Sequence, residues 1–138
     1  MTKNEMTQQP PQRTIISAGI AIRQLLTQSA AVKSLTRQVF PVVVDEAVLP
    51  YVVYRRASLT QVAVKGCAGA AQAQVEVACF AATYAESVRL AEAVNAALDR
   101  QRLTLPDGLT LRSCRYVDGE EGWQDDAYMQ RLVYDVRI

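Results

Sequence analysis

The chain has 138 residues, of which 50% are hydrophobic and 21% are charged, and its formal net charge is +1. This length suits a single domain, and a net charge so close to zero does not indicate a nucleic-acid or membrane-surface partner. No apolar run approaches the roughly eighteen residues of a membrane-spanning helix, and the polar N-terminus lacks the hydrophobic core of a signal peptide. We therefore expect a chain that is cytoplasmic when it is made.

The chain contains three cysteines and no histidine. Because Cys67, Cys79 and Cys114 show no Cys-x-x-Cys spacing, we expect reduced thiols that pack as small hydrophobic side chains. The absence of histidine removes the commonest general base and the usual partner of a serine or cysteine nucleophile. Glycine-rich phosphate loops, dinucleotide fingerprints and Gly-x-Ser-x-Gly motifs are absent as well. The sequence therefore predicts neither an enzyme nor a bound cofactor.

Residues 1–13 are rich in Gln, Thr and Pro, which predicts a flexible arm in front of a single domain of residues 14–138. Thr14 is a candidate N-cap for a helix whose apolar side chains recur at helical spacing. The expected buried stripe consists of Ile15, Ala18, Ile22 and Leu25, widened by Ile16, Ile20 and Leu26. A short second helical turn is expected over residues 29–35, before the chain becomes extended at residues 39–42.

A loop with Asp45 and Glu46 precedes residues 51–56, which are rich in strand-forming side chains. Each face of this expected strand carries a large aromatic or charged residue. We therefore expect partial exposure on both of its sides.

Residues 72–98 predict a buried strand that leads directly into a helix. We expect the strand to begin near Ala71, after a turn over residues 66–69. Polar and apolar residues alternate along the strand, with Gln72, Gln74 and Glu76 on one face and Ala73, Val75, Val77 and Cys79 on the other. Thr83 and Glu86 have the spacing of a capping box. We expect the helix over residues 84–102, with a stripe of Val88, Ala91, Val94 and Leu98 and with Arg100 and Arg102 in its last turn.

The C-terminal part predicts a tight turn over residues 105–108, then strands over residues 109–117 and 127–138. Residues 118–126 lie between these strands and are expected to form the acidic loop of a hairpin.

Together these elements predict an α+β fold, a two-layer sandwich in which a mostly antiparallel sheet of about five strands packs against two main helices. The sheet is mixed if the helix over residues 84–102 connects two parallel strands.

The expected acidic loop is the first candidate site. Several carboxylates could hold a divalent cation, but their spacing matches no calcium-binding loop, so a solvated loop without metal is the favoured interpretation. Trp123 lies in the middle of the loop and is either an interface anchor or folded back onto the core. The carboxylates concerned are Asp118, Glu120, Glu121, Asp125 and Asp126.

A second cluster combines aromatic and basic side chains in the strand over residues 51–56. Such residues can stack on nucleic-acid bases, form a subunit contact or cover an ordinary sheet edge. The near-neutral net charge disfavours nucleic acid, and the other two interpretations stay open. The residues concerned are Tyr51, Tyr54, Arg55 and Arg56.

Four segments stand in a distinctive order: residues 15–20 (IISAGI), 49–54 (LPYVVY), 75–98 and 128–136 (YMQRLVYDV). In this order they resemble the small tail-completion proteins of long-tailed phages and prophages, which include tail-to-head joining and tail-terminator-like proteins. The resemblance covers about residues 14–138 and includes no catalytic motif. Its most specific segment is LPYVVY.

The resemblance implies a structural protein without catalysis that forms a ring, commonly of six subunits, on the end of the tail tube. Such a ring stops growth of the tube and presents a surface to the head connector. It is assembled in the host cytoplasm and then lies at the head–tail junction of the virion. The implied partners are other copies of the chain, the tail tube and the head connector, with no membrane and no sequence-specific nucleic acid.

Within this interpretation, Tyr51, Tyr54, Arg55, Arg56 and Trp123 are candidate subunit-contact residues. The acidic loop is a candidate lining of the ring's lumen, where negative charge would let DNA slide through. The alternative function is a stand-alone ligand-binding or regulatory α+β domain, which a bound metabolite would favour. A weaker alternative is an enzyme with carboxylate chemistry at Asp125 and Asp126.

Overall fold

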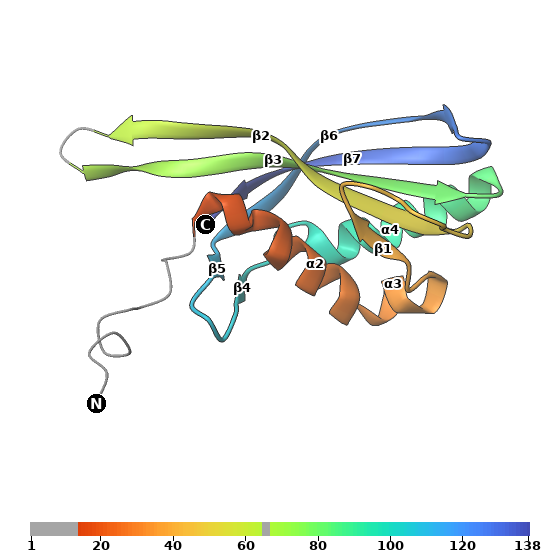
Figure 1. The fold of residues 1–138 in the computed structure, drawn as a ribbon, viewed down its shortest axis with the longest axis horizontal. Helices are drawn as coiled ribbons and strands as arrows, with labels where there is room; N and C mark the ends of the chain where they lie inside the picture. Colours follow the sequence, from red (N-terminus) through yellow and green to blue (C-terminus); the bar gives the residue numbers. More distant parts are fainter. Residues whose placement is uncertain (1–13, 65–66) are drawn as a thin grey trace.

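The computed structural model describes residues 14–64 and 67–138, and the expected N-terminal arm lies outside the described residues. A five-stranded sheet, in the order β1-β2-β3-β7-β6, forms one layer, and the helices form the second layer on one of its faces (Figure 1). The helical elements are η1 (Ile15–Ser17), α2 (Ala18–Gln28), α3 (Ala30–Leu35) and α4 (Tyr84–Leu98). The strands of the sheet are β1 (Val39–Pro41), β2 (Tyr51–Val64), β3 (Cys67–Ala81), β6 (Ser113–Gln124) and β7 (Ala127–Arg137). The predicted α+β sandwich is confirmed.

The N-terminal helices begin where the sequence places caps. The Thr14 hydroxyl accepts a hydrogen bond from the Ile16 N–H at 3.3 Å, and the Ser29 hydroxyl accepts one from the Val32 N–H at 3.2 Å. The buried stripe of η1 and α2 consists of Ile15, Ala18, Ala21, Ile22, Leu25 and Leu26. Ile16 and Ile20 are 66% and 44% exposed, so the predicted widening of the stripe by these two residues is wrong.

The sheet is mixed, but its parallel pair differs from the expected one. Strand β1 pairs in parallel with β2, whereas the other neighbours in the sheet are antiparallel. Helix α4 does lie in the connection between two parallel strands, β3 and β6, but β7 lies between them and is antiparallel to both, so they are not neighbours in the sheet. Strand β2 is also longer than predicted, and its Val52 and Tyr54 are buried under the helices, so partial exposure on both sides is wrong for these positions.

The strand and helix over residues 72–98 are confirmed, with different bounds. Strand β3 begins at Cys67 rather than near Ala71, and residues 65–66 of the expected turn lie outside the described residues. The Thr83 hydroxyl accepts a hydrogen bond from the Glu86 N–H at 3.2 Å, as one half of a capping box requires. The helix ends at Leu98 because Asp99 is extended and Arg100 has a φ of +62°, so Arg100 and Arg102 lie beyond its last turn.

The predicted turn over residues 105–108 joins a small two-stranded sheet of β4 (Leu103–Thr104) and β5 (Thr110–Leu111). The expected acidic loop, by contrast, is almost entirely strand. Strand β6 continues to Gln124, and only Asp125 and Asp126 connect it to β7, with φ values of +55° and +58°. Positive φ at both central residues is the geometry of a type I′ hairpin turn, whose twist matches that of the paired strands.

The main core lies between the helices and one face of the sheet, where the side chains of Tyr134, Val75, Val77 and Leu90 are almost fully buried. Cys79 and Cys114 are buried thiols in this core, and burial raises the pKa of Cys114 to about 12. The face turned away from the helices, here called the open face, carries a smaller cluster. Its buried members are Phe80, Ala127 and Met129. Among the described residues, no helix combines the length and apolar character needed to cross a bilayer.

Candidate protein-interaction surfaces

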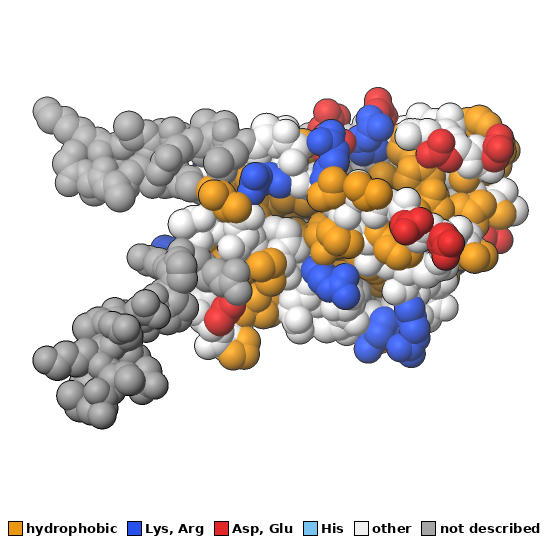
Figure 2. Space-filling model, in the orientation of Figure 1, with side chains coloured by type: hydrophobic (Ala, Val, Ile, Leu, Met, Phe, Trp, Pro, Cys, Tyr) orange, Lys and Arg blue, Asp and Glu red, His pale blue; other side chains and the backbone are white. Residues whose placement is uncertain are grey.

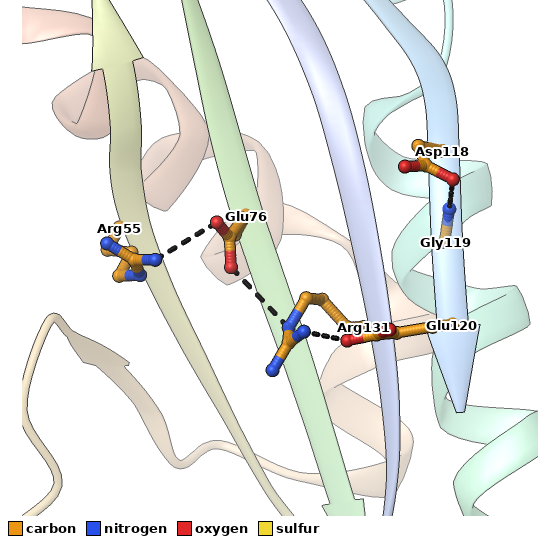
Figure 3. A network of polar contacts seen from close by, with 6 residues as sticks. All are labelled: Arg55, Glu76, Asp118, Gly119, Glu120 and Arg131. Atoms are coloured by element: carbon orange, nitrogen blue, oxygen red, sulfur yellow. Dashed lines mark hydrogen bonds and ion pairs between the residues drawn. The ribbon is translucent and has the colours of Figure 1, made fainter. Parts of the chain in front are cut away.

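A ladder of alternating charges crosses the open face from β2 to β6 (Figure 3). An Arg55 guanidinium nitrogen lies 3.0 Å from Glu76 Oε2 on β3, and Glu76 Oε1 lies 3.5 Å from Arg131 Nε on β7. Arg131 also pairs with Glu120 on β6. The outer members, Arg55 and Glu120, have side chains that are 50% and 59% exposed, against 22% for Glu76 and 33% for Arg131. The ladder is therefore most accessible at its two ends.

A groove of about 360 Å³ lies beside this ladder on the open face. Its lining includes Val42 and Val44 from the β1–β2 connection, and Tyr51 and Phe80, whose rings stack with centroids 4.8 Å apart. The ladder members Arg55, Glu76 and Arg131 line it as well. In Figure 2 hydrophobic surface, interrupted by acidic side chains, is visible at the end of the molecule that is opposite the tip of the β2–β3 hairpin. The groove therefore offers both charged and apolar contacts to a partner.

Three exposed aromatic rings form a second surface where the β6–β7 hairpin meets the start of α4. Trp123 is 61% exposed and meets Tyr128 edge-on with ring centroids 5.0 Å apart, and Tyr128 meets Tyr84 at 6.0 Å. Exposed tryptophan and tyrosine side chains are the types enriched at the energetic centres of protein interfaces. These three residues are called the aromatic patch below.

Glu121 connects this aromatic patch to strand β7 by hydrogen bonds. Its Oε2 accepts hydrogen bonds from Gln130 Nε2 and from the Tyr84 hydroxyl, each at 2.9 Å. The bond from Gln130 and the bond from Tyr84 stabilise the charged form, which lowers the pKa of the Glu121 carboxyl below its ordinary value.

The four residues predicted from the strand over residues 51–56 do not form one surface. Tyr54 is only 6% exposed and belongs to the main core, where its ring lies near Gly19 of α2. Tyr51 and Arg55 lie on the open face, opposite Phe80 and Glu76 of β3. Arg56 lies on the helix-covered face, where its guanidinium donates to the Ile16 carbonyl at 3.0 Å.

The predicted acidic residues are also divided. Glu120 belongs to the charge ladder of the open face, whereas Glu121 contacts Tyr84 on the other face. Asp118 Oδ1 accepts the N–H of Gly119 at 2.8 Å, and Asp125 and Asp126 form the hairpin turn. Within the part of the chain that the structure describes, no group of three or more His, Cys, Asp and Glu side chains is placed to hold a metal ion.

Sequence reasoning missed Glu76 and Arg131, the middle members of the ladder, and the partners of Trp123. Glu76 was recognised only as a polar position of an alternating strand, because strand pairing is not visible from one strand alone. A signal was nevertheless present, since Glu76 and Arg131 are opposite charges on two strands of the expected sheet and could pair across it.

Comparison with solved structures finds a similar fold in a chain from the "Virion of native gene transfer agent (GTA) particle". The two chains are 20% identical and superpose with a TM-score of 0.72, over 84% of this chain and 90% of the other. A search of curated proteins finds no match. The sequence profile of the family described as "Tail completion protein gp17" matches residues 20–138, which confirms the resemblance drawn from the sequence. The chain belongs to this tail completion family and is a structural protein of the phage tail.

Proposed function

We propose that the chain completes the tail by forming a ring on the end of the tail tube and joins that end to the head connector. Membership of the tail completion family is the observation that carries this proposal. The number of subunits that we propose, six, follows the family resemblance. Assembly would take place in the host cytoplasm, and the ring would then stay at the head–tail junction.

The β2 side and the β6 side of the sheet support a ring because they carry different charges. A ring needs a heterologous contact, in which one patch of each subunit meets a different patch of the next and rotation closes the circle. The β2 side of the sheet presents Arg55 and Arg56, whereas the β6 side presents acidic residues and Trp123. Two identical patches would instead favour a closed dimer.

Asp118 and Glu120 on the open face of β6, together with Asp125 and Asp126 of the hairpin turn, are proposed to face the path of the DNA, whereas Glu121 lies on the other face of the sheet. Glu120 is paired with Arg131, so the field there depends most on Asp118, Asp125 and Asp126. Negative charge along the channel would repel the phosphate backbone and let the genome pass without sticking. Mapping these residues to the outer rim of the assembled particle would refute this part of the proposal.

In this role the chain acts through its surfaces and makes or breaks no bond. The test is to add the purified full-length chain to tails assembled without it and to image them by electron microscopy. We expect one ring at one end of each tail, an end to further growth of the tube, and attachment of heads. Tails that keep growing and attach no heads in the presence of saturating chain would contradict the proposal.

A further inference from the structure

The groove of the open face and the aromatic patch lie at the same end of the molecule but on opposite faces of the sheet. The β6–β7 turn, which contributes to the groove lining, and the start of α4, which carries Tyr84, both lie opposite the tip of the β2–β3 hairpin (Figure 1). The patch belongs to the helix-covered face, because Tyr128 is opposite Trp123 in the register and meets Tyr84 of α4. Trp123 therefore cannot fill the groove of its own chain.

This arrangement of the two surfaces favours a ring over a dimer. If the patch of one copy occupies the groove of a second, the patch of the second copy points away from the first. The two copies then cannot exchange the same contact in both directions, and the unused patch is left for a third copy. A contact of this kind is heterologous, as a closed ring requires.

The groove has the size and chemistry to hold an aromatic side chain. Its apolar lining includes Val42, Val44 and the stacked rings of Tyr51 and Phe80. Its volume of about 360 Å³ lies in the range of pockets that hold small organic molecules, so an indole ring fits. The indole N–H is a donor only, and Gln124 in the lining has an amide oxygen that can accept it.

The charges beside the two surfaces are opposite and have the same spacing from them. Glu121 lies two residues before Trp123 on β6, and Arg55 lies two residues after Val53, which lines the groove on β2. Residues two apart on a strand share a face and are about 7 Å from each other. Placing Trp123 of one copy over Val53 of the next therefore brings Glu121 close to Arg55.

Both charged groups have bonding capacity left for such a pair. Among the described residues, Arg55 has Glu76 as its ionic partner through one terminal nitrogen, and its side chain is 50% exposed. Within the same part of the chain, Glu121 uses Oε2 for the bonds from Tyr84 and Gln130, which leaves Oε1 available. A guanidinium has five N–H donors, so the new pair can form while the existing bonds are kept.

We propose that the aromatic patch of one copy docks into the open-face groove of the next copy, with Trp123 in the groove and Glu121 paired with Arg55. The proposal rests on the ring of the proposed function and names its subunit contact. The occupant is a second copy because one chain carries both halves of the match, the groove with its arginine and the patch with its glutamate. A buried aromatic anchor is the type of contact that dominates the energetics of protein interfaces.

The first experiment follows the solvent access of Trp123, which is the only tryptophan of the chain. The full-length chain is produced with hydroxytryptophan, which is excited at longer wavelengths than the tryptophans of other tail proteins. It is then added to tails assembled without the chain, and rings are identified by electron microscopy. We expect acrylamide to quench the label much less in rings than in the free subunit.

The second experiment exchanges the two charges that the proposal pairs. Glu121→Lys and Arg55→Glu each place like charges at every contact and should need an about tenfold higher concentration than the unmodified chain to form rings. The chain with both substitutions has opposite charges at every contact again, so most of this loss should be recovered. Strands β3 and β7 separate the two residues within one chain, and the residues lie on opposite faces, so the recovery cannot arise inside a subunit.

A third variant tests the apolar part of the groove. Val44→Asp places a carboxylate where the docked ring would desolvate it, so rings should need an at least about tenfold higher concentration. Val48→Asp is the matched control, because Val48 is in the same connection but does not line the groove. Arg102→Glu, an exposed position beside β4, is the control for charge reversal. Both controls should assemble like the unmodified chain, and thermal unfolding confirms that every variant is folded.

The outcomes separate the two proposals. Rings in which acrylamide quenches the label as strongly as in the free subunit would overturn the docking contact and leave the ring intact. A doubly substituted chain that assembles no better than either single variant would do the same. An unmodified chain that forms no ring, even on tail ends, would overturn the ring itself and this contact with it.

Discussion

Val77 of β3 is a fully buried side chain of the main core. It lies opposite Tyr54 of β2 and Leu132 of β7, and its side chain has no exposure to solvent. A carboxylate at this position would be buried without a partner. Among the described residues, every buried side-chain nitrogen and oxygen already has a hydrogen-bond partner, so none is free to pair with it.

We predict that Val77→Asp lowers the free energy of unfolding by at least about 3 kcal/mol or prevents folding. The matched control is Val48→Asp, because Val48 is 72% exposed and should change stability by no more than about 0.5 kcal/mol. Urea denaturation followed by circular dichroism gives both values. Equal stability of the two variants would show that the β3 assignment is wrong.

Glu121 offers a titration test at the aromatic patch. Its lowered pKa means that the folded state binds a proton less readily than the unfolded state, so its hydrogen bonds stabilise the fold above the ordinary pKa of 4.5. This contribution is lost as the pH falls through the lower folded-state pKa.

We predict that Gln130→Ala raises the pKa of Glu121 toward its ordinary value, and that Tyr84→Phe does so to a smaller extent. NMR titration of the Glu121 side-chain carboxyl measures the shift directly. An unchanged Glu121 midpoint in both variants would mean that these hydrogen bonds do not form in solution.

Among the secondary-structure elements, α4 has a side-chain N-cap, which Thr83 provides. The Thr83 hydroxyl satisfies the N–H of Glu86, one of the groups that the helix leaves without an internal partner. We predict that Thr83→Ala destabilises the protein by about 1 kcal/mol, whereas Thr83→Ser keeps the acceptor and most of the stability. Chemical denaturation distinguishes the two, and a neutral Thr83→Ala would assign the start of α4 to tertiary packing instead.

The β6–β7 hairpin turn carries two aspartates in the left-handed region, where residues with a Cβ are strained. Asn-Gly is the sequence that this turn type prefers. We predict that Asp125→Asn combined with Asp126→Gly stabilises the isolated subunit by about 0.5–1 kcal/mol, while Asp126→Val destabilises it. A stability loss in the Asn-Gly variant would mean that the turn is of another type.

Local signals in the sequence predicted the helices and most strand starts, because caps and alternation depend on neighbouring residues. The N-cap at Thr83 and the alternation around Val75 are examples that the structure confirms. The length of β6 was not predictable in this way. Its exposed, acidic and glycine-containing half has the composition of a loop, and only pairing with β7 makes it a strand.

The candidate surfaces required even more long-range information. Tyr54 and Tyr51 are close in sequence and similar in type, yet strand geometry sends one into the core and the other to the open face. The ladder from Arg55 to Glu120 joins two hairpins, β2–β3 and β6–β7, that are far apart in the chain, so no local pattern contains it.

In the molecule as a whole, one face of the sheet is used for folding, and the other face remains open. The helices bury the first face, and the open face combines a groove of mixed polar and apolar lining with a charge ladder that extends from β2 to β6. For a structural protein of the phage tail, these surfaces are where contacts with other copies and with neighbouring virion proteins would form.

The most direct measurement of the tail-completion role is electron microscopy of particles produced without this chain. We predict tails of uncontrolled length and full heads that remain separate, with both defects corrected when the unmodified chain is supplied. Particles with tails of normal length, attached heads and full infectivity in its absence would contradict the account.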